Sequence, residues 1–268
     1  MGKGTWGRPA LVVAMGVLGV LGVLGGAGCR ENGSASPPSE TWAGGGAVAT
    51  GGAAVAASSA AASSAAASSA AEPAEARARV VLLGTSLTAG LGLDPAEAYP
   101  ALLQQRADSA GYRVEVVNAG LSGETSAGAL RRARWVLEQP AALVVLEVGA
   151  NDGLRGVDPD STYANLVALV GVVRAVQPGA RVVLVQMEAP TNLGARYTAG
   201  FHAAYARASR ATGVPLWPFL LEGVAGDPRY NQADGIHPNQ AGSVRVAATV
   251  WRSLGPVLAD LFGGPGTR

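Results

Sequence analysis

The sequence is poor in cysteine and histidine. Its 268 residues include one cysteine, Cys29, and two histidines, His202 and His237. A single cysteine rules out an intramolecular disulfide framework and any metal site built from several cysteines. The two histidines are far apart in sequence and give no ligand cluster, so we expect neither a metal ion nor another cofactor.

Basic runs of the kind that bind nucleic acid are also missing. The chain carries 20 Lys and Arg against 19 Asp and Glu, a net charge of +1. We therefore expect no nucleic-acid partner. The first 79 residues hold few aromatic or charged groups, whereas residues 80–262 have the mixed composition of a globular protein. One domain of roughly 180 residues, expected to be monomeric, is the simplest interpretation.

The N-terminal segment has the order of a secretory signal. Lys3 and Arg8 precede an uncharged apolar run, residues 10–28, that ends directly before Cys29. This order resembles a bacterial lipoprotein signal, which is removed before a lipid-bearing cysteine, although Gly26 stands where such signals usually have leucine. An ordinary secretory signal and an uncleaved anchor are the alternatives, and all three predict export.

We therefore predict a cleaved lipoprotein signal peptide over residues 1–28 and a lipid anchor at Cys29, with the protein facing the periplasm or the cell surface. Residues 29–79 are rich in alanine, serine and glycine. Such a segment cannot bury enough apolar surface to offset its chain entropy, so we expect a disordered tether, with an alanine-rich helix as the alternative. The folded domain then spans residues 80–262, and residues 263–268 form a disordered tail.

From residue 80 onward, short β-branched runs alternate with amphipathic segments of helical length. The runs predict five strands, the last one weakly: residues 80–84, 114–120, 142–152, 181–187 and 215–219. Segments with apolar residues at helical spacing lie between them: residues 96–111, 126–139, 162–179 and 197–213. Apolar strands joined by helices predict a parallel sheet covered on both faces, a three-layer α/β/α sandwich. In such sheets, ligands bind at the carboxyl ends of the strands.

Candidate site residues follow three of the predicted strands. Ser86 comes just after Gly84, near a helix N-terminus whose free N–H groups favour negative charge; this suits a nucleophile, and a local N-cap is the alternative. Gly120 and Gly123 let the backbone approach a ligand, or form an ordinary turn. Asn151 suits an oxyanion donor, with an Asx turn as the alternative.

A late polar loop, residues 231–240, carries one of the two histidines. Asp234 and His237 are three positions apart across Gly235, and Pro238 rigidifies the exit. This spacing lets the carboxylate reach imidazole Nδ1 and fix the tautomer, which leaves Nε2 as a base. The alternative is a surface loop with an incidental Asp and His.

The ordered set of Ser, Gly, Asn and Asp-x-x-His resembles the SGNH (GDSL) hydrolases, whose four motif blocks supply Ser, Gly, Asn and His. The resemblance covers residues 80–260 and rests on "LLGTSLTAGLGL", "VVNAGLSGETS", "VGANDGLRG" and "DGIHPN". These stretches are most similar to the bacterial thioesterase I, lysophospholipase and arylesterase branch. The resemblance implies a flavodoxin-like fold and a serine hydrolase that acts on small-molecule or lipid acyl esters or thioesters.

By position, the resemblance implies a catalytic triad of Ser86, Asp234 and His237. It also implies an oxyanion hole made by the backbone N–H groups of Ser86 and Gly123 and the side chain of Asn151. The chain departs from the family at Thr85, where an aspartate usually precedes the serine. Because Asp234 supplies the triad carboxylate, we expect activity to persist, with a change in how the Ser86 turn is held.

The substrate is predicted only by resemblance, which suggests medium-chain acyl esters and lysophospholipids. In the resembled branch the loop at residues 186–197 borders the acyl groove. A polysaccharide deacetylase of the same superfamily and a non-catalytic surface-binding lipoprotein on the same fold are the alternatives.

Two groups of basic residues lie outside the motifs. We expect His202 on a helix surface, because no acid or serine is placed in sequence to work with it. Arg131, Arg132 and Arg134 are expected to form a solvated helix face, with contact to lipid headgroups as the alternative.

Overall fold

The structure is a computed structural model that describes residues 76–264. The predicted signal peptide, the predicted lipid anchor at Cys29 and the predicted tether up to residue 75 lie outside the described residues. Residues 265–268 of the predicted tail lie outside them as well. Strand β1 (Ala78–Gly84) begins two residues before residue 80, where we placed the start of the domain.

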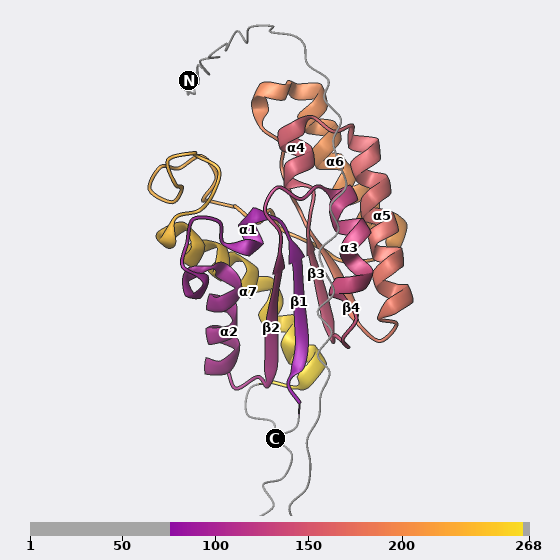
Figure 1. Ribbon diagram of the computed structural model, residues 1–268, viewed down its shortest axis with the longest axis vertical. Helices are drawn as coiled ribbons and strands as arrows, with labels where there is room; N and C mark the ends of the chain where they lie inside the picture. Colours follow the sequence, from indigo (N-terminus) through magenta and orange to yellow (C-terminus); the bar gives the residue numbers. More distant parts are fainter. Residues whose placement is uncertain (1–75, 265–268) are drawn as a thin grey trace, which may run out of the picture. The chain divides into compact units, whose positions relative to one another are not determined.

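Five parallel strands form the sheet, in the order β2-β1-β3-β4-β5 (Figure 1). The strands after β1 are β2 (Val114–Gly120), β3 (Leu143–Glu147), β4 (Arg181–Val185) and β5 (Leu216–Trp217). All neighbouring strands pair in parallel, so the predicted parallel sheet is confirmed. The strand order reverses at β1, which is flanked by β2 and β3, and a ligand crevice is expected at the carboxyl ends of β1 and β3.

Helices cover both faces of this sheet, as Figure 1 shows. On one face α2 (Tyr99–Ser109) contacts α7 (Gln240–Phe262). On the other, α5 (Pro159–Val176) contacts both α3 (Ser126–Val136) and α6 (Ala195–Thr212). Short helical segments follow the strands: α1 (Ser86–Ala89), η1 (Pro95–Glu97), α4 (Ala150–Arg155) and η2 (Thr191–Leu193). None of these described helices is long and apolar enough to cross a membrane.

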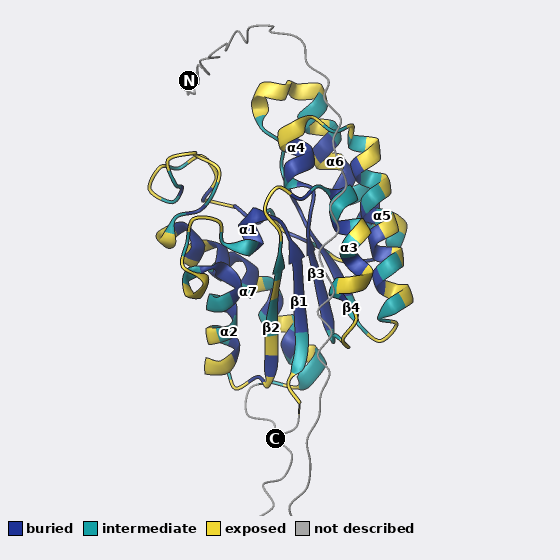
Figure 2. Ribbon diagram, viewed as in Figure 1, coloured by how far each residue is buried: buried dark blue, intermediate teal, exposed yellow. Residues whose placement is uncertain are grey.

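The centre of the core is formed by the inner strands, which are dark blue in Figure 2. Every residue of β3 is buried, as are the last five residues of β1 and the last four of β4. Strand β2 lies at the sheet edge and exposes Glu115 and Asn118. Burial on both faces explains why the inner strands are nearly continuous apolar runs.

The predicted third strand, residues 142–152, is too long. In the structure β3 ends at Glu147, and Gly149 adopts a φ of 98°, a left-handed conformation that ends the extended chain. Helix α4 follows, so Asn151 lies in the first turn of a helix rather than at the end of a strand. The predicted fourth and fifth strands are also shortened, to five and two residues.

Helix α7 was not predicted, although with 23 residues it is the longest described helix. Asn239 caps its start by accepting a hydrogen bond from the Gly242 N–H at 3.0 Å. Pro256 lies inside the helix and would ordinarily break it. The apolar face of α7, which includes the buried Leu254 and Leu258, packs into the core on either side of the proline.

Gly120, at the end of β2, allows helix α1 to approach the sheet closely. A Cβ at this position would lie 2.7 Å from Ala89 Cα and from the Thr88 carbonyl carbon, and would also clash with Ala89 N. Because these are backbone atoms, they cannot move without shifting α1. Because α1 begins at Ser86, the absence of a side chain at Gly120 also allows this serine to lie close to the sheet.

We therefore expect Gly120→Ala to lower the free energy of unfolding by about 1–3 kcal/mol, the usual effect of overpacking. The matched control is Gly171→Ala in α5, where a Cβ would meet nothing within 4 Å. Alanine is the better helix former, so this control should leave stability unchanged or raise it by up to about 1 kcal/mol. Denaturant unfolding measures both, and equal effects would contradict the close approach of α1.

Candidate active site

Ser86 is the first residue of α1, directly beyond the carboxyl end of β1. Thr85 caps this helix, because its side-chain oxygen accepts a hydrogen bond from the Leu87 N–H. Gly90 ends the helix in a left-handed conformation with a φ of 76°. The Ser86 side chain is buried, and no acceptor within the described residues takes the backbone N–H of Ser86. The turn thus presents both a hydroxyl and a free N–H donor.

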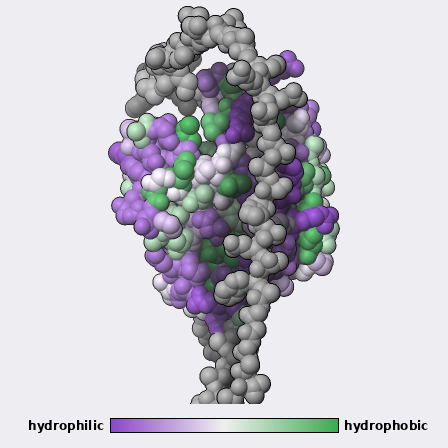
Figure 3. Space-filling view, in the orientation of Figure 1, coloured by the Kyte–Doolittle hydropathy of each residue, from purple (hydrophilic) through white to green (hydrophobic). Residues whose placement is uncertain are grey.

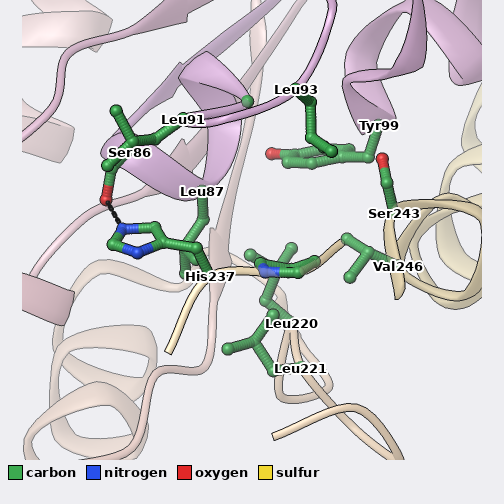
Figure 4. Close-up of a pocket in the computed structure, with 12 residues that line it drawn as sticks. Ser86, Leu87, Leu91, Leu93, Tyr99, Leu220, Leu221, His237, Ser243 and Val246 are labelled. Carbon is green, nitrogen blue, oxygen red and sulfur yellow. Dashed lines mark hydrogen bonds between the residues drawn. The ribbon is translucent and has the colours of Figure 1, made fainter. Parts of the chain in front are cut away.

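The structure brings Ser86, His237 and Asp234 into one hydrogen-bonded row. His237 Nε2 lies 2.8 Å from Ser86 Oγ (Figure 4), and His237 Nδ1 lies 2.6 Å from Asp234 Oδ2. Asp234 Oδ1 accepts the backbone N–H groups of Ile236 and His237, and the intervening Gly235, directly after Asp234, has a φ of 69°. The predicted three-residue spacing therefore does place the carboxylate on imidazole Nδ1.

The charge state of Asp234 suits a group that orients a histidine. Its partial burial acts to raise the pKa, but hydrogen bonds from the His237 ring and from the His237 and Ile236 N–H groups outweigh this effect and lower the pKa to about 2. The carboxylate is therefore ionised at neutral pH. An ionised acceptor keeps the proton of a neutral imidazole on Nδ1 and leaves Nε2 as the acceptor for the serine proton.

The loop that carries His237 is held by hydrogen bonds within itself and to the turn after α1. Asn231 and Pro238 form an isolated antiparallel bridge. The Gln232 N–H donates to the His237 carbonyl at 2.7 Å, and its side-chain amide donates to the Leu91 carbonyl at 2.7 Å. These bonds hold the imidazole ring over α1.

Two of the predicted oxyanion donors, Gly123 and Asn151, lie on neighbouring segments. Gly123, between β2 and α3, has a φ of 77°, and no acceptor within the described chain takes its N–H. Asn151 Nδ2 donates to the Glu124 carbonyl at 3.0 Å, and Arg155 donates to the Gly123 carbonyl at 2.9 Å. Because a side-chain amide has two N–H groups, Asn151 keeps one for a ligand.

Arg132 supports this loop and is not the solvated residue that we predicted. Its guanidinium binds both carboxylate oxygens of Glu124 at 2.6 Å, and it donates to the Ala119 and Gly84 carbonyls. Only 18% of the Arg132 side chain is exposed, because α3 turns it toward the strand ends. Its neighbours in the predicted solvated face, Arg131 and Arg134, are exposed.

Asp152 is a second supporting residue that the sequence patterns did not single out. It is fully buried, and its carboxylate accepts the Ser126 N–H at 2.7 Å and the Ser126 hydroxyl. Asp152 follows Asn151 in α4, while Ser126 begins α3 just after the Gly123 loop. The carboxylate therefore couples the two elements that carry the predicted oxyanion donors. The sequence could not show that Asp152 is buried, because an Asp directly after Asn151 is also typical of an exposed Asx turn.

Behind Ser86, the carboxylate of Glu147 accepts hydrogen bonds from the Thr85 N–H and hydroxyl and from the Thr88 hydroxyl. Complete burial raises the pKa of Glu147, the hydrogen bonds oppose it, and the net result is a pKa of about 7. Thr85 is thus anchored although it lacks the carboxylate of the resembled family. The sequence did contain a signal for the role of Glu147, because it is the one acidic residue in the otherwise apolar run 142–147.

His202 lies on the surface of α6, as expected, but it does have an acidic partner. Its Nδ1 is 2.6 Å from Oε1 of Glu188, which follows β4. The expectation that no acid is placed to work with His202 was wrong, because the fold brings the loop after β4 beside α6. No serine is hydrogen-bonded to this ring in the described part of the chain.

An apolar cavity lies beside Ser86 and His237, on the side of α7 (Figure 4). The aliphatic side chains that line it are Leu87, Leu91, Leu93, Leu220, Leu221 and Val246. Its volume of about 10 Å³ is close to the least that holds one water molecule. The cavity is therefore too small for an acyl chain.

Large exposed aliphatic side chains are found on the elements that follow β1 to β4 and on the histidine loop. Between 37% and 51% of each is exposed: Leu91, Leu121, Leu154, Leu193 and Ile236. On the face seen in Figure 3, hydrophobic residues lie in small groups among hydrophilic ones. Within residues 76–264, no group of three or more His, Cys, Asp and Glu side chains could hold a metal ion.

Comparison with known proteins shows that the chain is similar to ester hydrolases. The chain is 43% identical to esterase TesA of Pseudomonas aeruginosa over 184 residues, which is 68% of this chain and 90% of TesA. It is 37% identical to thioesterase 1/protease 1/lysophospholipase L1 of Escherichia coli K12 over 186 residues, 69% of this chain and 87% of the relative.

A solved structure agrees with these relatives. The psychrotrophic esterase EstA from Pseudoalteromonas, in a form inhibited by monoethylphosphonate, superposes with a TM-score of 0.64 at 35% identity and covers 67% of this chain and 98% of its own. The fold, the site and these relatives together define a carboxylic ester hydrolase. Residues 82–245 match the GDSL-like lipase/acylhydrolase family, and the chain belongs to that family.

The raised pKa of Glu147 predicts a pH-dependent stability. The pKa of Glu147 is about 7 in the folded chain and 4.5 ordinarily, so folding favours the protonated carboxyl group. The contribution of this group to the free energy of unfolding is complete below pH 4.5 and is lost as the pH rises through about 7. Relative to Glu147→Gln, the wild-type free energy of unfolding should fall by about 3 kcal/mol over this range. Denaturant unfolding across the range measures it, with exposed Glu115→Gln as control. A pH-independent difference would contradict the raised pKa.

Proposed function

We propose that Ser86, His237 and Asp234 form the catalytic triad of this ester hydrolase. The observation that carries the proposal is the unbroken row of hydrogen bonds from Asp234 through His237 to Ser86 Oγ. His237 takes the Ser86 proton at Nε2 while Oγ attacks the acyl carbon, and then gives that proton to the departing alcohol or thiol. Water, activated by the same histidine, releases the acid from the acyl-enzyme.

In this mechanism the tetrahedral oxyanion binds the N–H groups of Ser86 and Gly123 and the side-chain amide of Asn151. Support comes from the two backbone N–H groups, which no acceptor in the described chain takes. Further support comes from Asp152 and Arg132, which fix the loop and helix that carry the donors. Donors that are already oriented need no rearrangement when charge develops in the transition state.

For the substrate, we propose acyl esters and thioesters with an apolar acyl chain, including lysophospholipids. The names of the relatives support this class, since one is an esterase and another a thioesterase and lysophospholipase. The small cavity beside His237 cannot hold the acyl chain, so we propose that the chain binds on exposed aliphatic side chains such as Leu121, Leu154 and Leu193.

The test is hydrolysis of p-nitrophenyl esters from acetate to palmitate by the full chain, beside Ser86→Ala and His237→Ala. We expect turnover that both substitutions abolish and a fluorophosphonate probe that labels wild type but not Ser86→Ala. A phosphonate inhibits the related EstA, which supports the choice of probe. Folded wild-type protein that neither turns over any ester nor reacts with the probe would refute the proposed triad.

Removing one oxyanion donor should slow catalysis without disturbing the fold. We expect Asn151→Ala to lower kcat by roughly 10²–10³-fold, the usual effect of losing such a donor. The matched control is Asn165→Ala, because Asn165 also donates a side-chain hydrogen bond, to Ser126 Oγ, but lies in α5. A loss below about tenfold for Asn151→Ala, with Asn165→Ala similar, would remove Asn151 from the oxyanion hole.

We also propose that the enzyme is exported and anchored by lipids at Cys29. The support is the order of charge, apolar run and cysteine in residues 1–29, which lie outside the described residues. In a Gram-negative host, Cys29→Ser should move the esterase from the membrane fraction to the soluble fraction of the exported proteins, with unchanged kcat. Membrane retention of the Cys29→Ser variant would point instead to an uncleaved anchor.

A further inference from the structure

One buried carboxylate holds the turn that carries Ser86. Glu147, paired in the sheet with Gly84, has no exposed surface. Its Oε2 accepts from the Thr85 N–H at 2.9 Å and from the Thr88 hydroxyl at 2.7 Å, and its Oε1 accepts from the Thr85 hydroxyl at 3.0 Å. These donors stand on both sides of Ser86 in the sequence.

The space for this carboxylate exists because residue 84 is glycine. A Cβ at Gly84 would lie 2.5 Å from Glu147 Oε2 and would clash with Thr88 Oγ1. Thr88 also contacts the Tyr99 hydroxyl at 2.6 Å, and because Thr88 donates to Glu147, the Tyr99 hydroxyl must donate to Thr88. The whole set of hydroxyls is thus oriented toward Glu147, an arrangement that favours its ionised form.

The other ionisable groups near Glu147 keep one charge state near neutral pH. Burial, followed by the charge of Glu147, raises the pKa of Tyr99 from α2. Burial, followed by the charges of Asp152 and Glu147, raises the pKa of Tyr205 from α6. The guanidinium of Arg132 from α3 donates to the carbonyl of residue 84. The hydrogen bonds from Thr85 and Thr88 act to lower the pKa of Glu147 against the effect of its burial.

We propose that Glu147 is a positioning residue for Ser86, and that its ionised carboxylate keeps the turn in the conformation from which Ser86 attacks. This rests on the proposed function, in which Ser86 is the nucleophile. A neutral carboxyl group has one acceptor oxygen fewer and an added O–H donor, so the Thr85 and Thr88 donors then compete for acceptors. Protonation of Glu147 therefore loosens the turn on both sides of Ser86.

Glu147→Gln reproduces the neutral carboxyl group and supplies the test. In mildly alkaline buffer, its kcat for a p-nitrophenyl ester should be roughly 10–100-fold below wild type, the usual effect of a misplaced nucleophile. KM should change far less, because the side chains proposed to bind the acyl chain are untouched. As the pH falls through about 7, wild-type Glu147 loses its charge, and the ratio of the two kcat values should shrink toward one.

A purely structural role for Glu147 predicts a kcat ratio that does not change with pH, and that result would overturn the proposal. The matched control is Glu115→Gln, which makes the same change on the exposed edge strand and should give a ratio of one throughout. Should Glu147→Gln fail to fold, Thr88→Val and Thr88→Ser provide the second test. We expect Val to lower kcat and Ser, which keeps the hydroxyl, to restore it; wild-type kcat in Thr88→Val would overturn the proposal.

Wild-type activity separates failure of this inference from failure of the proposed function. Turnover that Ser86→Ala abolishes, together with a pH-independent ratio for Glu147→Gln, would reject the role of Glu147 and leave the triad in place. Wild-type protein that neither turns over esters nor accepts a fluorophosphonate at Ser86 would reject both.

Discussion

The hydrogen bond between Ser86 Oγ and His237 Nε2 is the interaction on which the rest of the site depends. It joins residues 151 positions apart, and it exists only because two separate structural units meet. One is the tight turn after β1, and the other is the closed loop before α7. Strand β1 sits between β2 and β3, and α7 packs against α2, so both units are fixed to the same core. Small shifts of either unit would lengthen the contact across which the proposed mechanism transfers a proton.

Carboxylates fix the geometry around this bond, and each has a different kind of partner. Asp234 accepts from the imidazole and from backbone N–H groups, Asp152 accepts from the start of α3, and Glu124 accepts from Arg132. Asp152 and Glu124 are buried, and a buried acid is tolerated only when hydrogen bonds replace the lost water. Each of these hydrogen bonds restricts a neighbouring segment. The segments restricted here are the ones that carry the proposed nucleophile, base and oxyanion donors.

The sequence motifs were enough to locate the candidate site, because each motif is local: a Gly-bounded turn, a short Asp-to-His spacing, an Asn after a buried run. The parallel sheet followed from apolar runs in the same way. The supporting residues were not predictable, since Arg132 and Asp152 act on partners brought close only by the fold. Helix α7 was not predicted because Pro256 interrupts its helical pattern. The end of β3 was placed too late because Gly149 continues an apolar run in the sequence, and only its φ in the structure shows that the strand has ended.

Thr85 shows how the rest of the site accommodates a departure from the family pattern. A carboxylate at this position would face Glu147 across a hydrogen-bond distance, and two like charges so close would force one of them to keep a proton. Threonine instead offers a donor to Glu147 and an acceptor to the Leu87 N–H, so one hydroxyl both anchors and caps the turn. The consequence is that Glu147 does not share a proton with a second carboxylate. Burial of its charge lowers stability, and the compensating gain is that the turn carrying the proposed nucleophile is held from within the core.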